Sequence, residues 1–478
     1  MKRSLFYILF AGMVFSGCKK DFLETKPTTS IDAPDAFSTP DKVTAAMNGL
    51  YDLMTLSTFT NHIMLTTDIK GGDMLVVSTG NYSRFVTEYQ FLQSPTAGYG
   101  TQFWRDGFRL ISNTNQAIKN LPTAPISDAQ KNDFLAEARM IRAWGNYQLV
   151  RLFGQPYSVA PTSLGIPKLE TPIGEKDPTP ARATVKEIYD FIVADLTFAA
   201  TNLSSTRNSV FRVTKNAAYG MLARVYLDME QWKLASDNAK LARAGFSLAP
   251  GADLLKGFVD PTSEWIWGLD YRSDDNSGYL QVASFQEPYD IGYSTFRATS
   301  TFFNLFAADD IRKKLFYVNE TKVATYEGDA LQRDKPMISR DGYLMNKFYF
   351  RSAWDLDVPL MRSAEMYLIE AEAEAELGNT VPAQTALYAV QKRSIPTAVI
   401  SANTGNALKA EIQVERRKEL FGEGFRFFDI LRRKETLVRT SPEHWAPLTL
   451  APGAQKNILP IPQSEREVSG LPQNPGYN

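Results

Sequence analysis

Apolar side chains recur every three or four residues along several long segments of the chain, as they do on the buried face of a helix. The segments 103–121, 134–153 and 183–203 follow this pattern most clearly. The last of them starts at Thr184 with Glu187 three residues later, a pair that caps the first turn of a helix. The pattern therefore predicts a strongly helical protein.

Two other segments share an internal spacing that is typical of paired helices. In each, a small or compact residue is followed by a second one twelve positions later and by a third one seven positions after that. Such residues let two antiparallel helices approach closely, as in tetratricopeptide-type hairpins. We expect a mostly α fold: a tetratricopeptide-like solenoid of helix hairpins, four in number, with long irregular loop insertions and a few short strands. The residues at these spacings are Ala223, Ala235 and Ala242, then Ala371, Ala383 and Val390.

Long irregular insertions separate the predicted helices, and two of them are rich in aromatic residues. Residues 265–303 hold ten aromatic residues and 81–108 hold eight, against 12% over the whole chain. Long loops inside a compact protein are usually functional. The alternation in Glu-Trp-Ile-Trp-Gly-Leu at 264–269 indicates a buried strand. The proline-rich stretch 156–180 is expected to run as an extended connector over the surface.

The N-terminus has the features of a targeting segment. Two basic residues precede a short apolar run, which ends in Phe-Ser-Gly before Cys18. The run is too short to span a bilayer but has the length of a signal-peptide core. We expect residues 1–17 to be a lipoprotein signal peptide, Cys18 to carry the lipid, 18–35 to form a flexible leash and 36–478 to form the folded domain. Cys18 is also the single cysteine of the chain, which excludes an internal disulfide.

Charge and composition exclude several classes of function. The chain has 52 Lys and Arg against 53 Asp and Glu, a net charge of −1, so a nucleic-acid partner is not expected. With two histidines far apart, at 62 and 444, and one cysteine, no zinc site and no cofactor are expected.

Two series of charged residues at helical spacing could suggest acid–base chemistry, but residues three or four positions apart on a helix more often form structural ion pairs. The two series are Glu415, Arg416, Glu419, Glu423 and Arg426, and Glu365, Glu370, Glu372, Glu374 and Glu376.

Several short motifs, in order along the chain, resemble those of the SusD/RagB family of Bacteroidota outer-membrane lipoproteins. They are Asp-Phe-Leu-Glu at 21–24 behind Cys18, Glu-Ala-Arg-Met-Ile-Arg-Ala at 137–143, Arg-Leu-Phe-Gly at 151–154, Asn-Ala-Ala at 216–218, Leu-Ala-Arg-Val-Tyr-Leu at 222–227, Pro-Leu-Met-Arg-Ser-Ala-Glu-Met-Tyr-Leu at 359–368, Glu-Ala-Glu-Ala at 370–373, Glu-Arg-Arg-Lys-Glu-Leu at 415–420, Gly-Phe-Arg-Phe-Phe-Asp at 424–429, Leu-Pro-Ile-Pro at 459–462 and Gln-Asn-Pro-Gly-Tyr at 473–477. The last motif is expected to fix the C-terminus against the body of the protein.

The resemblance implies a non-catalytic protein on the outside of the outer membrane. Family members cover a SusC-type TonB-dependent transporter and pass glycans, or in some members peptides, to it. The family's ligand site lies in loops that correspond to about 68–104 and 268–300 here. Aromatic rings suit the CH faces of sugars, and a few polar groups orient the hydroxyls. The candidate ligand-binding residues are Asp73, Tyr82, Arg84, Tyr99, Tyr279, Tyr289, Tyr293 and Trp354, and Tyr89 and Tyr271 are further rings in the same loops.

Two rival functions remain open on the sequence alone. A glycan-cleaving lipoprotein would need two carboxylates, which 53 acidic residues could supply. A tetratricopeptide-type scaffold would need no small ligand, but it would not need long aromatic loops either. A glycan is favoured over a peptide as the ligand, because aromatic platforms suit sugars, although peptide clefts use similar residues. A calcium ion could bind the Asp-Asp-Asn run at 274–276, which offers few ligands.

Overall fold

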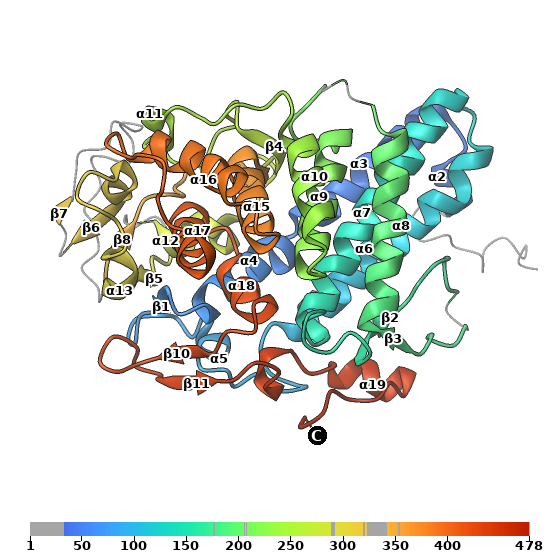
Figure 1. Ribbon diagram of the computed structural model, residues 1–478. Helices are drawn as coiled ribbons and strands as arrows, with labels where there is room; N and C mark the ends of the chain where they lie inside the picture. The colour runs from blue at the N-terminus through green and yellow to red at the C-terminus, as the bar shows by residue number, and fades with distance from the viewer. Residues whose placement is uncertain are drawn as a thin grey trace, which may run out of the picture.

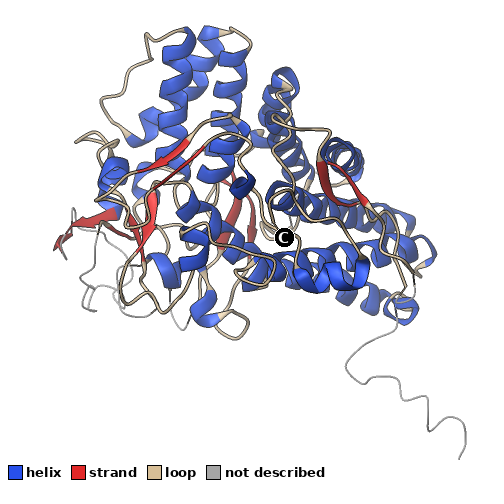
Figure 2. Cartoon of the chain, turned by 90° about the horizontal axis from the view of Figure 1, so that it is seen from below, coloured by secondary structure: helices blue, strands red, loops and turns tan. Residues whose placement is uncertain are grey.

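The structure is a computed structural model that describes residues 33–174, 177–204, 206, 208–287, 292–318, 321–322, 342–351 and 354–477. The predicted signal peptide, Cys18 and most of the leash lie outside the described residues. Helices make up most of the molecule, and the strands are short (Figures 1 and 2).

The long helices pack one after another in the order of the chain. Four pairs follow each other: α3 with α6, α7 with α8, α9 with α10, and α15 with α16. Contacts of α6 with α7, α8 with α9 and α10 with α15 join these pairs into one array, and α17 packs on α15 (Figure 1). The predicted solenoid of helix pairs is confirmed. The bounds are α3 Pro40–Thr55, α6 Gly100–Asn120, α7 Asp128–Phe153, α8 Val185–Asn202, α9 Lys215–Asp228, α10 Trp232–Arg243, α15 Ser363–Glu376, α16 Thr380–Ser394 and α17 Gly405–Leu420.

The insertions contain the shorter elements and small antiparallel sheets. Among the described strands, β1 pairs with β5, β2 with β3, β4 with β9, β10 with β11, and β6 with both β7 and β8. The strands are β1 Met74–Val76, β2 Leu164–Pro167, β3 Arg182–Thr184, β4 Trp265–Leu269, β5 Phe296–Ala298, β6 Phe316–Val318, β7 Thr321–Lys322, β8 Leu344–Met345, β9 Val358–Arg362, β10 Leu437–Arg439 and β11 Leu448–Leu450. The short helices are α2 Ala33–Ala36, α4 His62–Lys70, α5 Val86–Tyr89, α11 Gly251–Leu254, α12 Val282–Gln286, α13 Ser300–Phe303, α18 Arg426–Arg432 and α19 Gln463–Ser469.

Local sequence explains where the predicted helices begin. The Thr184 hydroxyl accepts from the Glu187 amide, and the Glu187 side chain reaches back to Thr184, so the predicted capping box at α8 is confirmed. Helix α7 begins at Asp128, six residues before the predicted start at 134. The reason is a second capping box between Ser127 and Gln130, which adds a polar first turn that apolar periodicity does not detect.

Small residues bring the paired helices together. The alanines of the predicted spacing are buried between α9 and α10 and between α15 and α16. In the pair α6 and α7, a Cβ atom at Gly107 would lie 2.7 Å from a methyl group of Leu149. Because that distance is shorter than a carbon–carbon contact allows, any larger residue at this crossing of α6 and α7 would force the Leu149 side chain to move. The predicted strand at 265–269 is β4, which is fully buried.

The charged residues on α15, on α17 and just after α17 form structural ion pairs, as predicted; on α15 each of the five glutamates contacts a cation. A central ion-pair network joins α17 to β4, β9 and the segment before β6, with five cations facing five carboxylates. Arg362 contacts Glu264, lies 3.0 Å from Glu419 and 2.6 Å from Glu423. Burial raises the pKa of the Glu423 carboxyl, but Arg362 and Lys347 outweigh burial and hold the pKa below its ordinary value. The members are Glu264, Asp310, Arg312, Lys347, Arg362, Arg393, Glu415, Lys418, Glu419 and Glu423.

The C-terminal motif is fixed to the body of the protein, as expected. The Asn474 amide donates to the backbone carbonyls of Phe153 and Leu459 at 2.9 and 2.7 Å, and Arg182 donates to the Asn474 side-chain oxygen at 2.6 Å. The Tyr477 hydroxyl donates to a backbone carbonyl at 2.9 Å. No helix in the part of the chain that the structure describes is both long and apolar enough to cross a bilayer.

Candidate functional site

Four of the predicted aromatic residues lie side by side and form a continuous surface, which we call the aromatic platform. The Tyr82 and Tyr293 rings are 5.3 Å apart between centroids, the Tyr293 and Tyr279 rings 5.7 Å, and the Tyr279 and Trp354 rings 4.2 Å. Tyr82 is 62% exposed and Tyr279 is 51% exposed. Exposed aromatic side chains that contact each other form a continuous apolar patch, and such patches often mark binding sites.

The β1–β5 pair sets the positions of the two loops that carry the platform. Met74 pairs with Ala298 and Val76 with Phe296, and the Val77 amide donates to the Thr295 carbonyl at 2.9 Å beyond the strands. The chain therefore leaves β1 toward Tyr82 next to the segment that enters β5 from Tyr293. Residues more than 200 positions apart meet because of this short pairing.

The backbone under the platform adopts left-handed conformations. Tyr82, Ser83 and Phe85 have φ of 53°, 57° and 57°, and Trp354 has φ of 67°. Non-glycine residues in this region cost free energy and concentrate at binding sites. Asn81 compensates part of the cost, since its amide donates to the Val77 carbonyl and its oxygen accepts from the Ser83 amide. These hydrogen bonds hold the loop in the shape that presents Tyr82.

Buried residues support the platform from below. Phe285 stacks on Tyr293 at 5.1 Å, and Phe85 packs against Phe285 at 4.9 Å. The Gln281 amide donates to the Trp354 carbonyl at 2.8 Å and ties the third segment to the second. Sequence reasoning missed Phe285 and Gln281 as supporting residues, because nothing local distinguishes them from other loop residues.

Arg84 supplies the positive charge of the site. Its guanidinium lies 5.4 Å from the centre of the Tyr293 ring and donates to the Tyr293 hydroxyl at 3.3 Å. It is therefore held beside the platform and can donate hydrogen bonds to the oxygen atoms of a ligand.

Tyr99 belongs to the layer beneath the platform. Its ring lies 4.7 Å from Phe85 and 4.6 Å from His62, and it is partly buried. Burial lowers the pKa of His62 to about 4, so the imidazole is neutral at pH 7. Tyr99 thus supports the loop that carries Tyr82.

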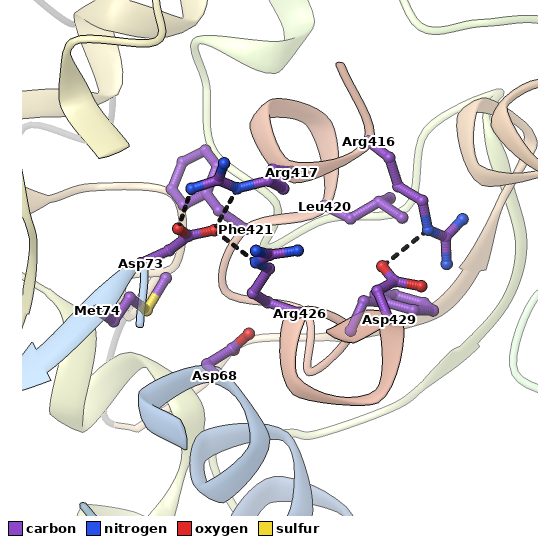
Figure 3. A pocket seen from close by; sticks show the side chains of 10 residues that line it. Asp68, Asp73, Met74, Arg416, Arg417, Leu420, Phe421, Arg426 and Asp429 are labelled. Atoms are coloured by element: carbon purple, nitrogen blue, oxygen red, sulfur yellow. Dashed lines mark hydrogen bonds and ion pairs between the residues drawn. The ribbon is translucent and has the colours of Figure 1, made fainter. Parts of the chain in front are cut away.

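Asp73 lies apart from the platform, in a buried ion-pair site (Figure 3). Its carboxylate contacts Arg417 at 2.5 Å and Arg426 at 3.5 Å. Nearby, Asp68 accepts from the Gly424 amide at 3.1 Å, and burial raises the pKa of its carboxyl. Because the Asp73 carboxylate is already paired with two arginines, we leave it out of the proposed ligand site.

Two further rings from the aromatic loops are core residues. The Tyr271 hydroxyl accepts from the Asn61 amide and donates to a backbone carbonyl, and Tyr89 contacts His444 at 2.9 Å. Both rings are at most 1% exposed, so interpreting them as ligand surfaces is wrong. Tyr289 lies outside the described residues.

The arrangement is suited to binding. Aromatic faces with a neighbouring arginine can hold a ligand that has flat apolar CH faces and polar edges. Within the described ranges, no group of three His, Cys, Asp or Glu side chains is placed to hold a metal ion.

Comparisons with known families give matches along most of the chain. A family model described as "Starch-binding associating with outer membrane" matches residues 21–227. A second model, described as "SusD family", matches residues 293–477. Among curated proteins, the chain is 25% identical to SusD-like protein P2 of Formosa agariphila, an alignment that covers 99% of both chains.

Solved structures share the fold. A SusD superfamily protein from Bacteroides vulgatus is 27% identical, with a TM-score of 0.80, and the alignment covers 92% of this chain and all of the other. A SusD superfamily protein from Bacteroides thetaiotaomicron is 24% identical with a TM-score of 0.82, and the alignment covers 91% of this chain and all of the other. A structure titled as a laminarin-binding SusD-like protein is 22% identical with a TM-score of 0.74, over 92% of this chain and all of the other.

Proposed function

The chain belongs to the SusD/RagB family, and from this premise we propose that it binds a glycan at the cell surface and delivers it to a SusC-type TonB-dependent transporter. The observation that carries the proposal is the aromatic platform. Tyr82, Tyr293, Tyr279 and Trp354 join three segments of the chain into one exposed ring surface. Stacking of sugar rings on such a surface needs no activated side chain.

A glycan fits the site better than a peptide does. The family model that matches residues 21–227 is described as starch-binding, and one structural neighbour is described as laminarin-binding. The platform itself is built of rings with Arg84 at its side, which suits stacking on sugars with hydrogen bonds to their hydroxyls. The family is one of binding proteins, and the chain is not an enzyme.

The proposed location is the outer face of the outer membrane, with the lipid on Cys18 as the anchor. The family description supports association with the outer membrane. In this proposal, residues 1–17 are removed and Cys18 begins the leash. We predict from the sequence that the leash ends at 35, but α2 starts at Ala33 and packs on α3, so the folded binding domain begins at 33. The leash would let the domain move against the transporter while it stays at the membrane.

A glycan array with matched variants tests the proposal. The purified protein is expected to bind a subset of glycans without shortening them. Tyr279→Ala and Trp354→Ala should each weaken that binding about 10-fold, which corresponds to about 1.4 kcal/mol. Tyr388→Ala, which removes a half-buried tyrosine on α16, is the control and should bind as the wild type does.

Each outcome distinguishes the proposal from its rivals. Binding that both platform variants retain unchanged would refute the assignment of the site. Shortened oligosaccharides after incubation would favour a glycan-cleaving lipoprotein. Binding to peptides and to no glycan would change the ligand class, and co-purification of a protein partner without any small ligand would favour a scaffold.

A further inference from the structure

A groove lies beside the strand that leads to the platform. It is an open groove of about 560 Å³ between β1, the start of α13, Tyr343 and the loop after β10. These elements lie at the same end of the molecule (Figure 1). Small-ligand sites in proteins have volumes of about 300 to 1,000 Å³, so the groove has room for one or more sugar rings.

The groove offers both kinds of contact that a sugar needs. Tyr343 and Trp445 are partly exposed aromatic residues in its wall. The Tyr343 ring stacks on Phe303 at 4.1 Å, and the Trp445 indole is fixed by a hydrogen bond to the Val76 carbonyl at 2.6 Å. Both rings are therefore held in place before any ligand arrives.

Uncommitted hydroxyl groups surround these rings. The side-chain hydroxyls of Ser78, Tyr343, Thr440 and Ser441 line the groove and make no hydrogen bond to any other described residue. Each can both donate and accept, as can the hydroxyls of a sugar. A groove built for an apolar ligand would not place four such groups around two rings.

The charge of the groove narrows the class of ligand. Glu443 is the one charged residue among the described residues that line it. Its carboxylate accepts from the hydroxyls of Ser300 and Thr301 at 2.5 and 2.8 Å and from the Thr301 amide at 2.9 Å. No Lys or Arg stands beside Glu443 among the described residues that line the groove, and such a negative charge repels carboxylated or sulfated sugars.

We propose that this groove is a second subsite for a neutral glycan, so that one long chain is held both there and on the aromatic platform. The inference rests on the proposed function, because it assumes that the platform binds a glycan. Tyr82 in the platform is four positions after Ser78 in the groove, and an extended chain covers at most about 14 Å in four steps. Two linked contacts on one ligand raise its affinity without a change at either site.

Blocking the groove tests the inference. Thr440→Trp places an indole at the exposed rim of the groove, away from the platform, and Val438→Trp places the same group two residues earlier on the exposed face of β10. Affinities for a length series of neutral oligosaccharides from the array are measured by calorimetry. We expect Thr440→Trp to lower the affinity for the longest members by about 10-fold or more and to leave the shortest unchanged, while Val438→Trp changes neither.

The outcomes separate this inference from the proposed function. If the wild type binds glycans and Thr440→Trp binds the long ones equally well, the groove is not a subsite, but the platform assignment stands. If Thr440→Trp loses short and long glycans alike, the effect comes from a change in the platform and the inference also fails. If the wild type binds no glycan, the proposed function fails, and the inference fails with it.

Discussion

Replacing Arg362 by methionine tests the charge balance of the central ion-pair network. Arg362 is 1% exposed and contacts three buried carboxylates, those of Glu264, Glu419 and Glu423. Without the guanidinium the network has four cations against five carboxylates, so one negative charge is left uncompensated in the core. Breaking a buried pair in this way costs about 3–5 kcal/mol.

The remaining contacts place the expected loss at the lower end of that range. Arg393 still contacts Glu264 at 2.7 Å and Glu419 at 2.5 Å, and Lys347 still contacts Glu423 at 2.6 Å. Arg312 also stays 2.9 Å from Glu419, so each carboxylate keeps at least one cation. We expect Arg362→Met to lower the free energy of unfolding by about 3 kcal/mol, measured by urea denaturation at neutral pH.

Two further variants make the test specific to charge. Adding Glu423→Gln to Arg362→Met restores neutrality, so the double variant should lose less than the two single losses together. Lys233→Met breaks an exposed pair with Asp237 on α10 and should cost no more than about 1 kcal/mol. A loss below 1 kcal/mol for Arg362→Met, or strict additivity in the double variant, would refute the reasoning.

Three other predictions concern pH, the C-terminus and the anchor. Burial raises the pKa of the Glu372 carboxyl, but Arg432 and Arg433 outweigh burial and hold the pKa well below its ordinary value. The ionised carboxylate therefore stabilises the fold at a pH above the unfolded pKa of about 4.3, and this stabilisation is lost as the pH falls further. The stability difference between the wild type and Glu372→Gln should therefore be about 3 kcal/mol at pH 7 and narrow steadily below about pH 4.3; a constant difference in urea titrations would contradict this. Asn474→Ala removes two buried donated hydrogen bonds and should cost about 2 kcal/mol by the same titration, and an unchanged midpoint would contradict the role assigned to the C-terminal motif. Cys18→Ala should release the protein from the membrane fraction into the aqueous phase of a detergent partition, and retention in the detergent phase would contradict the lipid anchor.

The helical frame could be predicted because its information is local. A helix face repeats every three to four residues, and the alanines between α9 and α10 recur at the same spacing between α15 and α16. The apolar repeat predicts a start of α7 that is six residues too late, because the polar capped turn at Ser127 has no apolar repeat. Periodicity therefore finds the buried part of a helix better than its ends.

The candidate site could be predicted only in part, because its contacts are not local. Composition identified the loops, and the structure brings Tyr82, Tyr279, Tyr293 and Trp354 together. Irregular segments have no period, so nothing in the sequence separates the buried ring of Tyr271 from the exposed ring of Tyr279 eight residues later. The partners of Asp73 could not be foreseen either, since Arg417 is 344 residues away.

The pairing of β1 with β5 has a consequence for how relatives of this protein could diversify. The three residue pairs of the β1–β5 ladder set the bases of the two loops, and ring contacts between the loops, such as Tyr82 with Tyr293 and Phe85 with Phe285, add to this pairing. Exchanging the loop tips between relatives would therefore leave the frame intact, provided that this short ladder is kept. One scaffold could in this way be fitted to many different polysaccharides, with new specificity arising from grafted turns rather than from a rebuilt core.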